Sequence, residues 1–71
     1  MTPKQVRSLL AVHQDGSINK AAHRLHLAPS SISAQLKELA AELEVPLFES
    51  KGRNIQLSDI GLSLLPKFQA F

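Results

Sequence analysis

Apolar residues in the first part of the chain recur at the spacing of α-helices. One series predicts a helix over residues 3–14 that is capped by Thr2 and begins at Pro3. After a turn at residues 15–16, Ser17 is expected to cap a second, shorter helix. The apolar positions of these two segments are Val6, Leu9, Leu10 and Val12, then Ile18, Ala21, Ala22 and Leu25. We therefore expect two short helices joined by a tight turn.

A third, longer helix is predicted over residues 29–43. Pro29 suits its first position, and Pro46 is expected to end it. The positions that share one face are apolar: Ile32, Leu36, Leu39 and Leu43. The opposite face carries small or polar residues: Ser30, Ala34, Lys37, Glu38 and Ala41. This helix should pack with one face and leave a small, polar face outside.

Strand-like runs follow the third helix. Residues 47–50 and 54–57 alternate in part around Lys51, Gly52 and Arg53, and this pattern predicts a small β-hairpin. The tip of the hairpin would then carry two positive charges.

The last segment of the chain predicts a fourth helix. Ser58 can cap it, with Asp59 at its positive end, while Pro66 is expected to kink or loosen it. Its apolar stripe consists of Ile60, Leu64, Leu65, Phe68 and Phe71. No residue near Phe71 signals a helix end, so we expect the helix to continue in a longer protein.

Composition narrows the class of protein. The chain has 71 residues, of which 44% are hydrophobic, which suits one small domain with a marginal core that oligomerisation would support. It has no cysteine, so disulfides and thiolate zinc sites are excluded. The first apolar run, residues 9–12, is too short for a secretion signal or a membrane span. We therefore expect a cytoplasmic protein without membrane contact.

The formal net charge is only +2, but it is unevenly distributed. Residues before position 38 hold five basic side chains and one acidic one, whereas residues 38–49 are acidic and Lys51 and Arg53 are again basic. Such a basic side is compatible with a polyanionic partner, although a solvated surface gives the same pattern. Trp and Tyr are absent, which argues against a binder of single strands because such proteins stack bases on aromatic rings.

Metal binding and catalysis find little support in the sequence. His23 and His26 stand three residues apart and His13 lies nearby, but no carboxylate stands at helical spacing from the pair. The serines lack a Gly-x-Ser-x-Gly context, and no glycine-rich phosphate loop is present. We expect no cofactor, no metal and no enzymatic activity.

The order of the elements indicates a DNA-binding fold. Two short helices before a helix with a small outer face are typical of the helix-turn-helix, because bulky side chains would hold that helix away from base edges. The predicted fold is mainly α: a winged helix-turn-helix over residues 1–57, with three helices and a small β-hairpin wing. Residues 58–71 would begin a further helix, whose apolar stripe suits dimerisation. The third helix, about 29–43, would enter the major groove, and the wing, about 46–57, would meet the backbone or minor groove.

Several spaced blocks resemble one known family. Asp-Gly-Ser-Ile-Asn-Lys-Ala-Ala at 15–22, Leu-His-Leu at 25–27, Ser-Ile-Ser-Ala-Gln-Leu at 31–36, Val-Pro-Leu-Phe-Glu at 45–49 and Gly-Arg at 52–53 are similar to the N-terminal DNA-binding domain of LysR-type transcriptional regulators. The resemblance covers the whole chain. It implies a winged helix-turn-helix, a linker helix that pairs two subunits, and higher oligomers in full-length members. A small-molecule effector would bind only through a further domain absent from this chain.

The chain also departs from the family pattern. Members commonly carry Ser or Thr at Ala28, Gln at Pro29, often Arg at Ala34, and Arg at Ser50. Without an arginine at position 34, bidentate recognition of guanine by that side chain is impossible. We expect specificity to rest on thymine methyl contacts near Pro29 and Ala34 and on deformable or A·T-rich sequence.

The expected binding residues follow from these arguments. Those for DNA are Lys20, Pro29, Ser30, Ser31, Ser33, Ala34, Gln35, Lys37, Lys51 and Arg53. Those for a homodimer are Ile60, Leu64, Leu65 and Phe68. The alternative is a helical module that binds a partner protein through the apolar face of residues 58–71. Only the DNA function predicts affinity for duplexes that falls steeply with salt.

Overall fold

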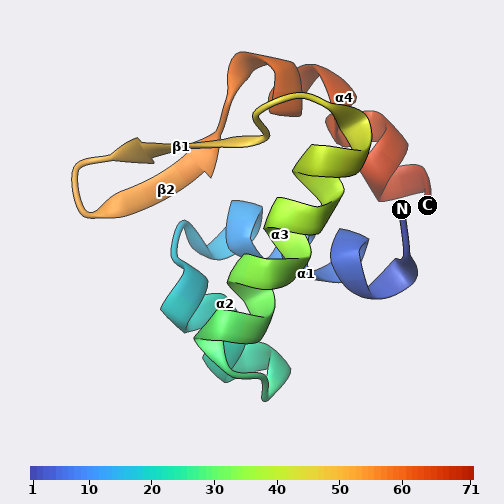
Figure 1. Cartoon of the computed structure of the whole chain (residues 1–71). Coiled ribbons are helices and arrows are strands. Elements are labelled where there is room, and N and C mark those ends of the chain that lie inside the picture. The colour runs from blue at the N-terminus through green and yellow to red at the C-terminus, as the bar shows by residue number, and fades with distance from the viewer.

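The computed structural model describes residues 1–71 and contains four helices and one antiparallel hairpin. The elements in chain order are α1 (Pro3–Asp15), α2 (Ile18–Leu25), α3 (Pro29–Leu43), β1 (Phe48–Lys51), β2 (Asn54–Leu57) and α4 (Asp59–Ala70). The hairpin projects from one side of the helices, and the two termini lie on the other side (Figure 1). None of the helices combines the length and apolar character needed to cross a membrane. The predicted winged, mainly α arrangement is confirmed.

Three predicted N-caps are present. The Thr2 hydroxyl accepts a hydrogen bond from the backbone N–H of Gln5 at 3.2 Å, and the Gln5 side chain accepts one from the Thr2 N–H at 3.0 Å. Ser17 and Ser58 each accept a bond from the backbone N–H three residues further on, at 3.2 and 3.1 Å. These bonds satisfy N–H groups that a helix start leaves without an intrahelical partner. The helix starts predicted at these positions are therefore confirmed.

The ends of α2 and α3 are made by left-handed backbone rather than by proline. The helix α3 has the predicted bounds, Pro29–Leu43, but Glu44 with φ 58° makes its end two residues before Pro46, which was expected to do so. His26 ends α2 in the same way, with φ 57°. Neither position carries glycine, the residue that usually signals this conformation. The sequence pattern therefore lacked the cue for these two ends.

The hydrophobic core joins all four helices and the hairpin. Its largest fully buried apolar side chains are Val12, Leu9, Ile32, Leu39 and Leu47. On α3, three of the four predicted inward residues are buried, and Leu43 is half-buried. Because α3 packs through this stripe, its opposite face stays free of the core.

The two strands of the hairpin are paired in a fixed register, and a backbone hydrogen bond joins β2 to the turn between α1 and α2. Phe48 pairs with Leu57 at the base, and a two-residue loop closes the tip, where Gly52 has φ 61°. Glycine with positive φ at the first loop position is typical of a type II′ turn, whose twist suits a hairpin. The Ile55 N–H donates to the Gly16 carbonyl at 3.2 Å, and the Ser58 N–H donates to the Leu47 carbonyl at 2.9 Å. The Ile55 bond therefore ties the wing to the helices, whereas the Ser58 bond extends the strand pairing at the base of the hairpin.

Helix α4 packs on the same core as the rest of the chain. The expected domain division after residue 57 falls between β2 and the cap of α4, but Phe68 is only 2% exposed and belongs to the core. Leu64 and Leu65 are half-buried, whereas Ile60 is 45% exposed. The apolar stripe expected for dimerisation is therefore divided, because its inner part covers the chain's own core. The helix also continues through Pro66.

Ala28 leaves the start of α3 without a side-chain cap. Its backbone is extended, with φ −72° and ψ 142°, and no side-chain hydrogen bond reaches the first turn. We expect Ala28→Ser to raise the free energy of unfolding by about 1 kcal/mol, because a serine hydroxyl at this position accepts a bond from that turn. Urea denaturation measures the change.

The matched control is Ala41→Ser in the exposed interior of α3, where serine should lower stability by about 0.5 kcal/mol. Equal effects at the two positions would contradict the capping explanation.

Candidate nucleic-acid interface

The outer face of α3 is exposed and carries small side chains near its N-terminus. Pro29, Ser30, Ser31 and Ala34 are exposed, and Lys37 follows one turn later. α2 packs against α3 across the short connection at residues 26–28. This is the geometry that lets the N-terminal part of a recognition helix approach base edges.

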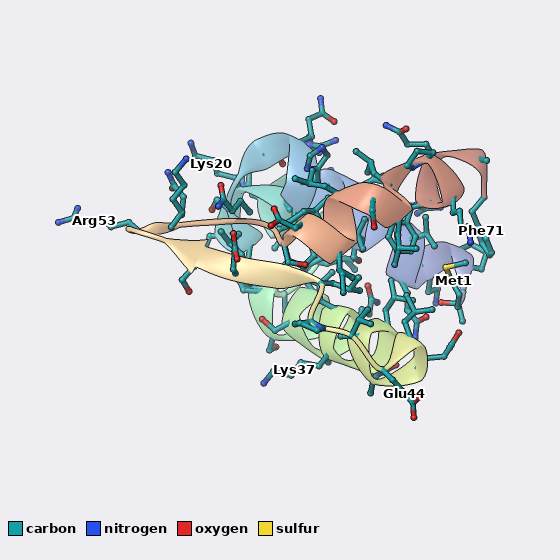
Figure 2. The ribbon with its side chains drawn as sticks, turned by 90° about the horizontal axis from the view of Figure 1, so that it is seen from above. Met1, Lys20, Lys37, Glu44, Arg53 and Phe71 are labelled. Atoms are coloured by element: carbon teal, nitrogen blue, oxygen red, sulfur yellow. The ribbon has the colours of Figure 1, made fainter.

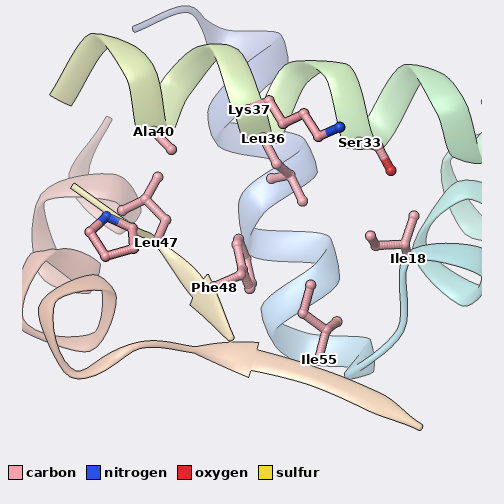
Figure 3. A pocket seen from close by; sticks show the side chains of 9 residues that line it. Ile18, Ser33, Leu36, Lys37, Ala40, Leu47, Phe48 and Ile55 are labelled. Atoms are coloured by element: carbon pink, nitrogen blue, oxygen red, sulfur yellow. The ribbon is translucent and has the colours of Figure 1, made fainter. Parts of the chain in front are cut away.

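One edge of α3 faces the hairpin across an apolar groove of about 260 Å³. Leu36 and Phe48 line its interior, and Ser33 and Lys37 project from α3 at its rim (Figure 3). Ile18 and Ile55 close the far end. The predicted contact residues Ser33 and Lys37 therefore lie on the wing side of α3, so a ligand that spans helix and wing would meet them.

The opposite edge of α3 packs against α1 through polar contacts. The buried Ser8 hydroxyl donates to Oε1 of Gln35, and the Gln5 amide donates to Oε2 of Glu38 at 3.4 Å. Gln35 was predicted to bind DNA directly, but its oxygen is engaged by Ser8. Its amide NH₂ group still offers donors to a ligand. Sequence reasoning missed Gln5 and Ser8, although they stand beside the apolar positions of α1 at helical spacing.

Most positive side chains have no acidic partner. Of the eight lysines and arginines, only Arg24 forms an ion pair, with Asp15 at 3.0 Å. Arg24 also donates to the Ala11 carbonyl at 3.4 Å, so it joins α2 to α1. The others remain available for an anionic ligand: Lys4, Arg7, Lys20, Lys37, Lys51, Arg53 and Lys67.

The hairpin presents its two tip cations to different faces. Arg53 lines a polar depression of about 310 Å³ together with Ser17 and Asn19 at the start of α2. Lys51 lies with Glu49 in a depression on the other side of the hairpin. Lys51 is the last residue of β1, whereas Arg53 stands in the two-residue turn, where the chain reverses direction. Lys20 and Arg53 lie at the same end of the molecule, and Phe71 lies at the opposite end (Figure 2).

The histidines and acids do not form a metal site. No group of three or more His, Asp or Glu side chains is arranged to hold a metal ion. Every buried side-chain nitrogen and oxygen has a hydrogen-bond partner.

The domain combines a helix whose exposed face carries small side chains, a wing beside it, and unpaired cations around both. These features define a winged helix-turn-helix domain of the DNA-binding class. The sequence matches the family model for bacterial regulatory helix-turn-helix proteins of the lysR family over residues 3–62. The chain belongs to this family.

Relatives and solved structures agree with this assignment. The chain is 38% identical over 71 residues to the uncharacterized HTH-type transcriptional regulator MJ1120 of Methanocaldococcus jannaschii, covering 100% of this chain and 25% of the relative. It is 39% identical over 64 residues to the probable RuBisCO transcriptional regulator of Trichormus variabilis, covering 90% of this chain and 19% of the relative. The chain thus spans a quarter or less of the length of these two regulators.

Two similar solved structures contain DNA. The CbnR DBD–DNA complex matches with a TM-score of 0.92 and 33% identity, covering 99% of this chain and 80% of that one. The complex of the BenM DBD with benA site 1 DNA matches with a TM-score of 0.90 and 27% identity, covering 99% and 79%. The fold of this chain is therefore that of the DNA-binding domains in these complexes.

Proposed function

We propose that this chain is the DNA-binding domain of a LysR-type transcriptional regulator and binds double-stranded DNA sequence-specifically. The observation that carries the proposal is the exposed small face of α3 lying among unpaired cations. Cations neutralise phosphates, and a helix without bulky side chains can lie deep in the major groove. The similar CbnR and BenM domains occur in complexes with DNA, which supports the same ligand here.

From their positions in the fold, α3 and the wing are proposed to contact different parts of the duplex. α3 enters the major groove with Pro29, Ser30 and Ala34 nearest the bases, and Ser33 and Lys37 face the backbone on the wing side. The wing reaches the adjacent backbone or minor groove through Arg53. Phosphate contacts hold the register, while base contacts and deformability of the duplex specify sequence.

Duplex binding and its salt dependence test this function. We expect affinity for a 20-bp duplex, measured by fluorescence anisotropy, to fall steeply as salt is raised, because phosphate contacts release counterions. A chain that does not bind duplex, or binds without salt dependence, would contradict the proposal. That result would favour the alternative function, a module that binds a protein partner.

The two hairpin cations should contribute unequally. We expect Arg53→Gln to reduce the slope of log affinity against log salt by about 0.9, or roughly eightfold in affinity at 0.1 M salt. Lys51→Gln is the matched control: it removes the same charge from the same hairpin but on the other face. Its effect should be clearly smaller. Equal slopes for the two variants would show that the face of the hairpin does not matter.

Residues 58–71 are proposed to form a homodimer contact through the exposed side of α4. Ile60, Leu64 and Phe71 lie on one flank of the helix, whereas Leu62, two positions after Ile60, lies on the other. Ile60 and Leu62 are nearly equally exposed, at 45% and 48%. The half-buried Leu64 and Leu65 would lie at the edge of the contact. Phe68 is buried in the core and would only hold α4 in place.

We expect Ile60→Asp to weaken dimerisation at least tenfold, because it places a charge in an apolar contact. Analytical ultracentrifugation measures the dissociation constant. Leu62→Asp serves as the control for charge and exposure and should leave dimerisation nearly unchanged. A parent chain that is monomeric at high micromolar concentration would contradict the dimer contact.

The proposed role includes no catalysis and no cofactor. The relatives are transcriptional regulators, and such a protein is proposed to work on DNA in the cytoplasm. A small-molecule effector would bind to another domain of the longer regulator, which could also form higher oligomers.

A further inference from the structure

We infer that a depression between α1 and α3 binds a phosphate of the DNA backbone, on the edge of α3 that faces away from the hairpin. The site rests on the proposed DNA-binding function and adds Lys4 and Arg7 to it. Neither residue was among the contacts expected from the sequence.

The depression has a volume of about 190 Å³ and is lined by α1, by α3, and by Leu25 of α2 and Leu27 of the connection that follows it. Lys4 and Arg7 contribute from α1, and Ser31 and Gln35 contribute from α3. Lys4 and Arg7 stand three residues apart, so they lie on the same face of α1. Four groups that can donate hydrogen bonds thus surround one opening.

No acidic side chain lines this opening or pairs with its cations. The nearest acid along α3, Glu38, accepts a bond from Gln5 instead. Ser8 holds the oxygen of Gln35, which leaves the Gln35 NH₂ group as the free end of that side chain. The opening therefore presents two positive charges and hydrogen-bond donors, and this chemistry suits a phosphate.

The position of the depression indicates which of the two DNA strands supplies the phosphate. Ser31 and Gln35 mark one edge of α3, and Ser33 and Lys37 mark the other. α1 begins on one side of α3, and the hairpin projects on the other (Figure 1). A helix about 10 to 12 Å across fills a major groove about 12 Å wide, so its two edges face the two bordering strands. The wing edge meets one strand, and the Lys4–Arg7 edge meets the other.

Salt titration tests the site. The probe is a fluorescein-labelled 20-bp duplex titrated by anisotropy at several KCl concentrations from about 0.05 to 0.3 M. We expect Lys4→Gln and Arg7→Gln each to lower the salt slope by about 0.9, and the double variant by about 1.8. The matched control is Lys67→Gln on α4, which removes another exposed, unpaired charge. Its slope should match that of the parent.

Substitution of single phosphates then locates the contact. Each phosphate is replaced in turn by an uncharged methylphosphonate in a duplex that the parent selects from a random library. The parent should lose affinity at positions on both strands. Within each half-site, the loss should disappear on one strand only in the Lys4→Gln/Arg7→Gln variant, and at other positions in Arg53→Gln.

The outcomes separate this site from the function on which it rests. A parent that shows no salt-dependent binding overturns both. A parent that binds, together with Lys4 and Arg7 variants whose slopes equal that of Lys67→Gln, overturns the site alone. The site would also be overturned if the Arg7 and Arg53 variants became insensitive to methylphosphonate substitution at the same phosphates. Because Lys4 and Arg7 are exposed, both variants should fold, and circular dichroism checks this.

Discussion

Replacement of Gly61 by alanine is expected to lower the free energy of unfolding by about 3 kcal/mol. Gly61 lies in the first turn of α4, where the helix meets the hairpin. A Cβ atom built there would lie 2.5 Å from the Leu47 carbonyl oxygen and 2.9 Å from Cδ2 of Leu57. Both distances are too short for non-bonded contact, so α4 must move away from the hairpin.

At an exposed helix position the same substitution changes the free energy of unfolding in the opposite direction. There, glycine to alanine stabilises a helix by up to about 1 kcal/mol. At Gly61 the obstacle is partly backbone: the Leu47 carbonyl also accepts the Ser58 N–H at 2.9 Å and cannot move freely. A domain of this size has a total stability of only roughly 4 to 10 kcal/mol, so the loss is a large part of the whole.

Urea denaturation measures the loss. Gln69→Ala, at an exposed position of the same helix, is the control and should change stability by less than about 0.5 kcal/mol. A Gly61→Ala chain as stable as the parent would show that α4 does not pack against Leu47 at the distance described. Since Phe68 also lies in the core, we expect the whole domain, and not α4 alone, to become less stable.

Ala34→Arg is expected to add a preference for guanine to the recognition helix. Ala34 is exposed on the outer face of α3, near the N-terminal end that approaches the bases. An arginine can bond guanine through two donors, and such a pair discriminates against other bases by about 1 to 3 kcal/mol, or roughly 5- to 150-fold. The parent, with only a methyl group there, should prefer thymine at the contacted position.

Selection from random duplexes measures both preferences. The control is Ala41→Arg, which adds the same charge to the same exposed face two turns further along, beyond the end that reads bases. It should raise affinity for all duplexes without a new base preference. A parent site rich in G·C, with affinity unchanged when uracil replaces thymine, would contradict the methyl contact.

Local chemistry in the sequence determined most of the secondary structure. The caps Thr2, Ser17 and Ser58 predicted three helix starts because a capping hydroxyl acts on an N–H only three residues away. Gly52 predicted the hairpin turn for a similar reason. The ends at His26 and Glu44 were less predictable because surrounding structure imposes left-handed backbone on residues that do not favour it.

The sequence by itself determined which residues share a face, and only the tertiary structure decided what covers each face. Helical spacing placed Phe68 on the same stripe as Ile60, but packing put Phe68 in the core and left Ile60 outside. The hairpin turn likewise put Lys51 and Arg53 in different depressions, and the α1–α3 contact brought Lys4 and Arg7 beside Ser31. The physical reason is that periodicity is a property of one segment, whereas burial and ion pairing depend on neighbours distant in the chain.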